Sequence, residues 1–413
     1  MSPFICEIGT TLAARMFAMV GPFSVSIITS RVLGPEERGR YFLILALAQI
    51  GAQIGSLGMQ SSNTYLVANR RELVGPLLAN SLLVSTTATP IVTCFLALVL
   101  GWPDLLGLGS LVGASLGPIA LAAVIISPLM VISLFINNIA IGVGRVQLFN
   151  GLTVAYSLVA IMAASVVSAI GGGTLLFLLA TAIAVAAPSI LGARRLLGEQ
   201  AFRLRLDVEL FRRGIGYAAK AYFATMFSFV MTRVGVFALQ HQGNFQEIGQ
   251  FSVAMQLADG LTMLPSTVAM LLFPMLVRAD DHQRRPAMWR AFWSLGAIMF
   301  VVLGAVAVLA PWLIPLLYGH DFTRAVALTQ AMLPSVMIVS LVSVISQYLS
   351  AEGFPMNQVL AWLVGLIVQT ALSYWFAAKW GGVGVALAIM VSSSLVFALL
   401  LLETLFRRTG DIR

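Results

Sequence analysis

Apolar residues dominate this chain in long runs, and polar residues gather in short stretches between them. Most runs exceed the roughly 20 residues that an α-helix needs to cross the hydrocarbon core of a bilayer. Charged residues, glycine and proline mark the ends of the runs. The pattern predicts twelve membrane spans, near residues 8–30, 41–68, 76–100, 112–141, 148–170, 174–192, 215–238, 248–276, 289–316, 326–350, 358–378 and 383–404.

The composition agrees with a membrane protein. Hydrophobic residues make up 59% of the 413 residues and charged residues only 10%, whereas a soluble domain needs a more polar surface. The net charge of +8 would suggest nucleic acid in a soluble protein. Here most of the basic residues lie in short loops between the apolar runs. The cytoplasmic loops of membrane proteins are enriched in arginine and lysine, so the net charge needs no nucleic-acid partner. We therefore expect an all-α integral membrane protein that binds no nucleic acid.

The distribution of arginine and lysine predicts the orientation. With the N-terminus inside, sixteen basic residues fall in inner loops and tails and five in outer loops. This asymmetry places both termini in the cytoplasm. Three basic residues remain inside spans, Arg15, Lys220 and Arg233.

The two halves of the chain resemble each other at an offset of about 209 residues. Three blocks match: Ile136–Gly144 with Ile345–Gly353, Gly172-Gly173 with Gly381-Gly382, and Gly34 with Gly243. An alternative explanation of these matches is that glycine recurs wherever a helix ends. Six spans separate the copies, so both halves run the same way through the membrane. This is a parallel repeat, related by a pseudo-two-fold axis along the membrane normal.

The repeat predicts three parts of the chain. Residues 1–192 form an N-terminal lobe of six helices, and residues 215–413 form a C-terminal lobe of six. Residues 193–214 join them and carry six arginines. We interpret this stretch as a basic, cytoplasmic linker.

Several short motifs resemble a known family. Arg31-Val-Leu-Gly-Pro-Glu-Glu-Arg-Gly-Arg-Tyr-Phe42 looks like the signature that follows the first helix of polysaccharide exporters. Further matches are Gly249-Gln-Phe-Ser252, Leu272-Phe-Pro274, Gln347-Tyr-Leu349, Ala351-Glu-Gly353 and Gly381-Gly-Val-Gly-Val-Ala386. The ordered set resembles the polysaccharide transporters and oligosaccharide repeat-unit flippases (O-antigen and exopolysaccharide flippases) of the multidrug/oligosaccharidyl-lipid/polysaccharide exporter superfamily.

This resemblance implies a fold and a cargo. It implies two six-helix bundles in a V that opens alternately to each side of the inner membrane. It implies that undecaprenyl-diphosphate-linked oligosaccharide units move from the cytoplasmic to the periplasmic leaflet for polysaccharide biosynthesis. Besides the lipid-linked oligosaccharide and membrane lipids, a polysaccharide polymerase and a chain-length regulator are the expected partners. The family shares no catalytic motif to carry over.

Charge inside a span is costly and points to function. Arg15 and Lys220 lie at comparable depths in the first and seventh spans, which the repeat pairs. We predict that both bind substrate through its diphosphate, since arginine makes forked contacts to phosphate oxygens and lysine supplies a mobile charge. Lys220 is equally compatible with reaching back to the inner interface. Arg233, near the outer end of its span, is expected to reach outward.

Asp259 is the one acid near the middle of a predicted span. It is expected to form an ion pair with Lys220 or Arg15, or to carry a coupling proton or Na⁺. Amide side chains within spans bind sugar hydroxyls or join helices. The candidates for sugar contacts are Asn137, Asn138 and Gln256.

Two other functions are less well supported. A cation-coupled multidrug exporter of the same superfamily would favour acids in its cavity, whereas the spans hold three cations and one deep acid. A membrane polymerase or glycosyltransferase would need a long outer loop, and the predicted outer loops are about ten residues or shorter. The sequence contains no nucleotide-binding loop, and its two cysteines and three histidines are scattered. We therefore expect no catalytic residue, no metal site and no cofactor.

Overall fold

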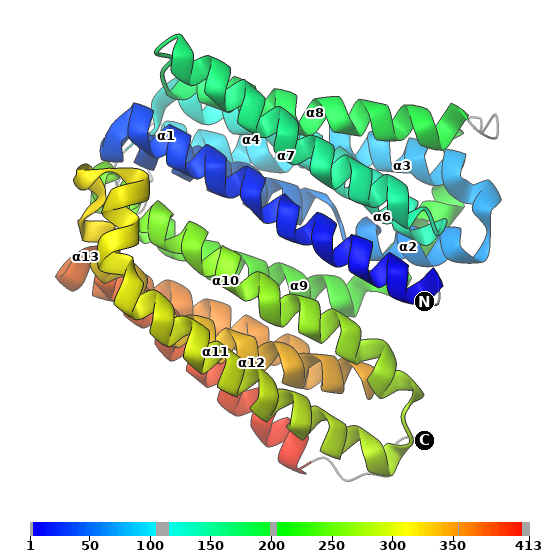
Figure 1. Ribbon diagram of the computed structural model, residues 1–413. Helices are drawn as coiled ribbons and strands as arrows, with labels where there is room; N and C mark the ends of the chain where they lie inside the picture. Colours follow the sequence, from blue (N-terminus) through cyan, green and yellow to red (C-terminus); the bar gives the residue numbers. More distant parts are fainter. Residues whose placement is uncertain (1–2, 105–114, 199–204, 354, 407–413) are drawn as a thin grey trace. The chain divides into compact units, whose positions relative to one another are not determined.

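The regular structure of this chain is helical wherever the structure describes it. The computed structural model describes residues 3–104, 115–198, 205–353 and 355–406 (Figure 1). Its α-helices are α1 (Pro3–Gly55), α2 (Met59–Asn69), α3 (Val74–Thr86), α4 (Ala88–Gly101), α6 (Ala122–Gly142), α7 (Val146–Ala169), α8 (Thr174–Gly198), α9 (Val208–His241), α10 (Phe245–Arg278), α11 (Asp281–Tyr318), α12 (Arg324–Ala351) and α13 (Met356–Phe406). Short 3-10 helices lie at Arg71–Leu73, Gly117–Leu121 and His320–Phe322. The predicted all-α fold class is confirmed.

The helices match the predicted spans. Within the described residues, nine helices are long and apolar enough to cross a membrane. α13 is counted there once, yet its 51 residues contain two predicted spans separated at Gly381, where φ is 58°. α1 likewise changes direction at Gly34, where φ is 68° and ψ is 175°. With these two breaks, each of the twelve predicted spans overlaps a described helical segment, and the chain is a multi-pass membrane protein.

The chain divides into two compact units, Met1–Tyr222 and Phe223–Arg413. The division falls inside α9, a few residues beyond the predicted linker of residues 193–214. Residues 199–204 of that linker lie outside the described part of the chain. Each unit is therefore described by itself.

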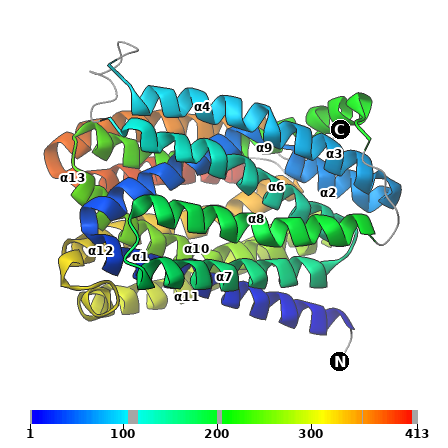
Figure 2. The same ribbon diagram turned by 90° about the horizontal axis from the view of Figure 1, so that it is seen from above.

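In the first unit, α1 packs along α7, and α6 packs against α8 and α2. α7 and α8 run side by side in both views (Figures 1 and 2). Glycine allows a close approach of α1 to α7, because a Cβ atom on Gly21 would lie 2.6 Å from the Cβ atom of Ser157. These contacts bring α6, α7 and α8 around one pocket.

In the second unit, α12 is the central helix. It packs against α10, α11 and α13, and Leu328, Val344 and Ile345 on it are completely buried. α10 packs mainly on α12 and only lightly on α11. The unequal packing leaves a groove between α10 and α11.

Two of the predicted spans are broken at points that no charged residue marks. The span at 41–68 is interrupted between α1 and α2, where Leu57 and Gly58 have positive φ angles of 50° and 73°. The hydroxyl of Tyr222 donates a hydrogen bond to the carbonyl of Ile54 at 2.8 Å, which gives this carbonyl at the end of α1 a second donor besides the Leu57 N–H. The span at 76–100 bends at Thr87 (φ −116°, ψ −72°), because Pro90 lacks an N–H and its ring crowds the carbonyl four residues earlier.

Left-handed glycines recur in both units. Positive φ angles occur at Gly34 and Gly243, at Gly144 and Gly353, and at Gly171 and Gly381. The first two pairs lie at the offset of the sequence repeat, and the third is one residue away from it. Each pair ends a helix at the same point of the six-segment order, since glycine adopts this conformation without steric cost.

Candidate functional site

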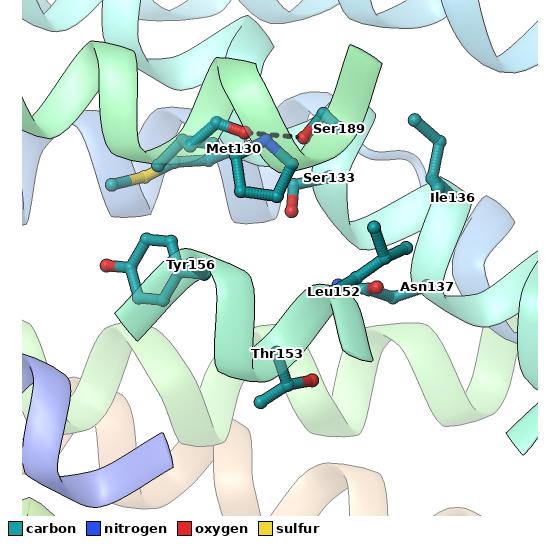
Figure 3. A pocket seen from close by; sticks show the side chains of 10 residues that line it. Met130, Ser133, Ile136, Asn137, Leu152, Thr153, Tyr156 and Ser189 are labelled. Carbon is teal, nitrogen blue, oxygen red and sulfur yellow. Dashed lines mark hydrogen bonds between the residues drawn. The ribbon is translucent and has the colours of Figure 1, made fainter. Parts of the chain in front are cut away.

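A pocket of about 240 Å³ lies between α6, α7 and α8 in the first unit (Figure 3). Its lining comes from one face of each helix, because residues three or four apart share a face. The lining residues are Met130, Ser133, Ile136 and Asn137 of α6, Leu152, Thr153 and Tyr156 of α7, and Val185, Pro188 and Ser189 of α8. Tyr156 and Asn137 lie at opposite ends of the pocket in this view (Figure 3).

The polar groups of this pocket are hydroxyls and an amide. Thr153 Oγ1 donates to the Phe149 carbonyl at 2.9 Å, and Ser189 Oγ donates to the Val185 carbonyl at 2.6 Å. Their oxygen lone pairs therefore remain as acceptors. The side-chain oxygen of Asn137 is buried and has no hydrogen-bond partner among the described residues. No carboxylate lines the pocket in the described part of the chain, so it presents neutral hydrogen-bonding groups to a ligand.

The second unit holds an ion pair inside predicted spans. A guanidinium nitrogen of Arg233 on α9 lies 2.7 Å from the Asp259 carboxylate on α10. The Arg233 side chain is mostly buried and the Asp259 side chain is half exposed. Two other nitrogens of Arg233, Nε and Nη1, are buried without a hydrogen-bond partner within the described ranges. The pair therefore combines an accessible carboxylate with an arginine whose Nε and Nη1 donate no hydrogen bond among the described residues.

Among the side chains that the structure describes, the partner of Asp259 is Arg233, whereas the predicted partners Lys220 and Arg15 have side chains outside the described residues. Arg233 reaches toward the carboxylate instead of outward. Counting from the outer helix ends at about 1.5 Å per residue, Arg233 lies about 12 Å deep and Asp259 about 21 Å deep. The long arginine side chain spans much of this difference, and pairing neutralises a charge that the hydrocarbon core would penalise.

The other predicted site residues fall into three groups. The side chains of Arg15 and Lys220 lie outside the described residues. Asn138 joins α2 to α6, because its side-chain oxygen accepts a hydrogen bond from Thr64 at 3.2 Å, while its amide nitrogen donates within α6 to the Leu134 carbonyl at 2.8 Å. Gln256 is half-buried on α10, one turn from Asp259. Asn137 is the one of the three amides that lines the pocket.

Sequence reasoning misses most of the pocket. Ser133, Tyr156 and Ser189 do not stand out in the sequence, because isolated hydroxyls are common in membrane helices. Their helical spacing is the available signal: Ser133 precedes Asn137 by one turn, and Thr153 precedes Tyr156 by three residues. That spacing shows a polar face on each helix but not that the faces meet.

Solved structures share this architecture. A multidrug resistance transporter of the MATE family, of the MOP superfamily, in an inward-facing conformation has a TM-score of 0.71 and 15% identity, covering 98% of this chain and 99% of its own. The lipid II flippase MurJ, in an inward closed conformation, has a TM-score of 0.72 and 15% identity, covering 97% of this chain and 88% of its own. The MATE multidrug transporter DinF-BH, solved as a complex, has a TM-score of 0.67 and 16% identity, covering 98% of this chain and 96% of its own.

These likenesses show the fold of the chain. The chain has the fold of the MATE multidrug transporters and of the lipid II flippase MurJ. No protein-family model matches the chain. No curated protein matches it by sequence.

Proposed function

We propose that this protein is a flippase for lipid-linked oligosaccharides. In this proposal it moves undecaprenyl-diphosphate-linked repeat units from the cytoplasmic to the periplasmic leaflet of the bacterial inner membrane, for O-antigen, capsule or exopolysaccharide synthesis. The two units alternate between openings to each side, and both termini are cytoplasmic. A polymerase and a chain-length regulator would receive the product.

The pocket between α6, α7 and α8 carries the proposal. Its hydroxyl oxygens and the unpartnered oxygen of Asn137 accept hydrogen bonds, which sugar hydroxyls donate. The Tyr156 hydroxyl adds a donor next to an aromatic ring, a combination that suits a polar ligand with an apolar face. A cationic ligand would find no carboxylate among the described lining residues to neutralise it.

The balance of charge inside the predicted spans supports an anionic cargo. Arg15, Lys220 and Arg233 are cationic and Asp259 is the one deep acid. Because Arg233 neutralises Asp259 at 2.7 Å, the remaining charges are positive. The flippase among the similar structures, MurJ, is described as acting on lipid II.

A direct transport assay tests the proposal. The protein is reconstituted in proteoliposomes with a fluorescent undecaprenyl-diphosphate oligosaccharide, and dithionite quenching reports the leaflet of the label. The wild-type protein should accelerate exchange, and Ser133→Ala together with Tyr156→Phe should slow it about tenfold. Ser165→Ala, an exposed serine on α7 outside the pocket, is the matched control and should leave the rate unchanged.

The alternative, a cation-coupled multidrug exporter, makes the opposite prediction. Two of the similar structures described above are multidrug transporters, and the half-exposed Asp259 could bind a coupling ion. The same vesicles, given a proton or Na⁺ gradient and a cationic dye, would then export the dye and leave the lipid-linked oligosaccharide in place. That result would replace the flippase proposal.

A further inference from the structure

The hairpin formed by α10 and α11 contains a second cavity, separate from the pocket of the first unit. It is a groove of about 680 Å³ at the end where α10 stops and α11 starts. α10 contributes Leu271, Leu272 and Met275 to one wall, and α11 contributes His282, Gln283 and Arg290. The groove therefore joins an apolar wall to a polar, basic one.

Local sequence explains why the two helices stand apart here. α10 is held on its other side by α12, and α11 presents the small residues Ala287 and Ala291 to the groove. The hairpin itself is fixed by Arg284, whose Nε lies 3.0 Å from the carbonyls of both Leu276 and Ala279. Its Nη1 lies 3.3 Å from the carboxylate of Glu352, directly after the end of α12. These hydrogen bonds of Arg284 hold the hairpin that encloses the groove.

The dimensions of the groove suit one leaflet of a bilayer. Its lining runs from Val268 on α10 to Ala279, directly after the helix at the hairpin end, about 16 Å at 1.5 Å per residue. Half of a hydrocarbon core of about 30 Å is about 15 Å. Met275 in the groove is 67% exposed and Trp293, just beyond it on α11, is 70% exposed. Apolar groups this exposed fit contact with the acyl chains of lipids.

The charge of this end is positive. Residues 278–290 contain four arginines and two aspartates, and one of the arginines, Arg284, is paired with Glu352. Arg290 lines the groove and is exposed, as is His282. A guanidinium forms charge-assisted hydrogen bonds with phosphate oxygens, and basic pockets between membrane helices on the cytoplasmic side bind anionic headgroups. The orientation predicted from the arginine distribution puts this end at the cytoplasmic leaflet.

We propose that the groove between α10 and α11 binds an anionic diacyl phospholipid of the cytoplasmic leaflet. One acyl chain lies against Leu271, Leu272 and Met275. The phosphate is held by Arg290, whose long side chain reaches toward the hairpin end, and the rest of the headgroup lies beside His282 and Gln283. The ligand is a resident membrane lipid and is distinct from any transported cargo, so the site stands whether or not the proposed flippase activity is correct.

Native mass spectrometry of the purified full-length protein tests this site. Delipidated protein is titrated with phosphatidylglycerol, phosphatidylcholine and undecaprenyl phosphate. The wild-type protein should retain phosphatidylglycerol preferentially, and Arg290→Gln should bind it about fivefold more weakly, as expected for one basic residue near a headgroup. Arg194→Gln, an exposed arginine on α8, is the matched control and should bind like the wild type.

A second variant tests the apolar wall without changing charge. Ala291→Phe fills the groove and should lower phosphatidylglycerol binding while thermal unfolding in detergent shows an intact fold. Equal retention of phosphatidylglycerol and phosphatidylcholine by the wild-type protein, or unchanged binding in Arg290→Gln, would overturn the proposal. Displacement of phosphatidylglycerol by undecaprenyl phosphate at equal concentration would also overturn it and assign the groove to the cargo lipid.

Discussion

The backbone N–H of Gly382 donates a hydrogen bond to the carboxylate of Glu247, with 3.0 Å between the nitrogen and Oε1. Glu247 lies in the first turn of α10 and Gly382 starts the second segment of α13, directly after the left-handed Gly381. The carboxylate therefore caps a helix start, where the helix dipole favours negative charge. The first unit has a counterpart: Thr174, the first residue of α8, donates its hydroxyl to Glu37 at 2.6 Å.

Replacing Glu247 should destabilise the protein. Its side chain is 13% exposed and also lies 3.5 Å from Arg324. Glu247→Ala leaves the Gly382 N–H without its acceptor, and an unmade hydrogen bond of a buried group costs about 1–3 kcal/mol. Thermal unfolding in detergent should show a lower midpoint. Glu36→Gln, whose exposed partner is Arg40, should change the midpoint little, since exposed ion pairs contribute about 0–1 kcal/mol. Equal midpoints for Glu247→Ala and the wild type would contradict the capping role.

The order of the spans could be predicted from the sequence because a bilayer imposes one length on every helix. Breaks within apolar runs could not. The turn at Leu57 and Gly58 lies in a stretch, residues 41–68, that contains no charged residue and no proline, so the sequence predicts a single span. It depends on a tertiary contact, the Tyr222 hydroxyl on the Ile54 carbonyl, which joins residues far apart in the chain.

The candidate site was predictable only in part, for a related reason. Amide residues inside spans stand out, and Asn137 lines the pocket. Its neighbour Asn138 looks the same in the sequence but is used in hydrogen bonds to Leu134 and Thr64. Which of two adjacent amides faces a pocket depends on the rotation of α6 against α7 and α8, and that rotation is set by packing. The pairing of Arg233 with Asp259 could not be predicted from the sequence. The sequence gives the depth of each residue along its own helix, but not which residue of a neighbouring helix it faces.

The ion pair between Arg233 and Asp259 should behave as a coupled unit. Either single neutral substitution, Arg233→Gln or Asp259→Asn, leaves a charge in the membrane without its partner. The double variant removes both charges and should recover part of the loss, with a coupling energy of about 1 kcal/mol or more. Thermal unfolding and expression of the four proteins give this double-mutant cycle.

A parallel cycle of Asp259→Asn with Lys220→Gln serves as the control and should be additive. Additive losses in the Arg233 cycle, combined with coupling in the Lys220 cycle, would show that Asp259 pairs with Lys220 instead of Arg233. A Na⁺- or proton-dependent transport rate lost in Asp259→Asn alone would assign the carboxylate a coupling role instead.

Cysteine labelling should locate the joining segment. The predicted orientation places residues 193–214 in the cytoplasm, so Gln200→Cys in a background with Cys6→Ser and Cys94→Ser should resist a membrane-impermeant maleimide in intact cells. It should react after the inner membrane is permeabilised.

Gly173→Cys, in the turn between α7 and α8, is the control and should react in intact cells with a permeabilised outer membrane. A Cβ atom there meets no other atom within 4 Å in the described part of the chain, so the substitution should not disturb the fold. Labelling of Gln200→Cys in intact cells would reverse the topology.

The cargo prediction rests on Arg15, whose charge lies inside the first span. A diphosphate must leave water to cross a low-dielectric core, and a guanidinium offsets part of that cost through charge-assisted hydrogen bonds. Arg15→Lys keeps the charge but loses the planar fork, so transport should fall partially. Arg15→Gln loses the charge and should reduce transport at least tenfold, because a charge-assisted hydrogen bond contributes about 1.5–3 kcal/mol.

Complementation of a strain that lacks surface polysaccharide measures this effect, with immunoblots to compare protein levels. Arg70→Gln, an exposed arginine in a predicted inner loop, is the matched control and should complement fully. If Arg15→Gln is present at the wild-type level and restores full surface polysaccharide, Arg15 is not the phosphate contact. Lys220→Gln then decides between the two remaining interpretations. Loss of transport in that variant would move the phosphate contact to the seventh span, and full transport in both variants would remove the argument for an anionic cargo.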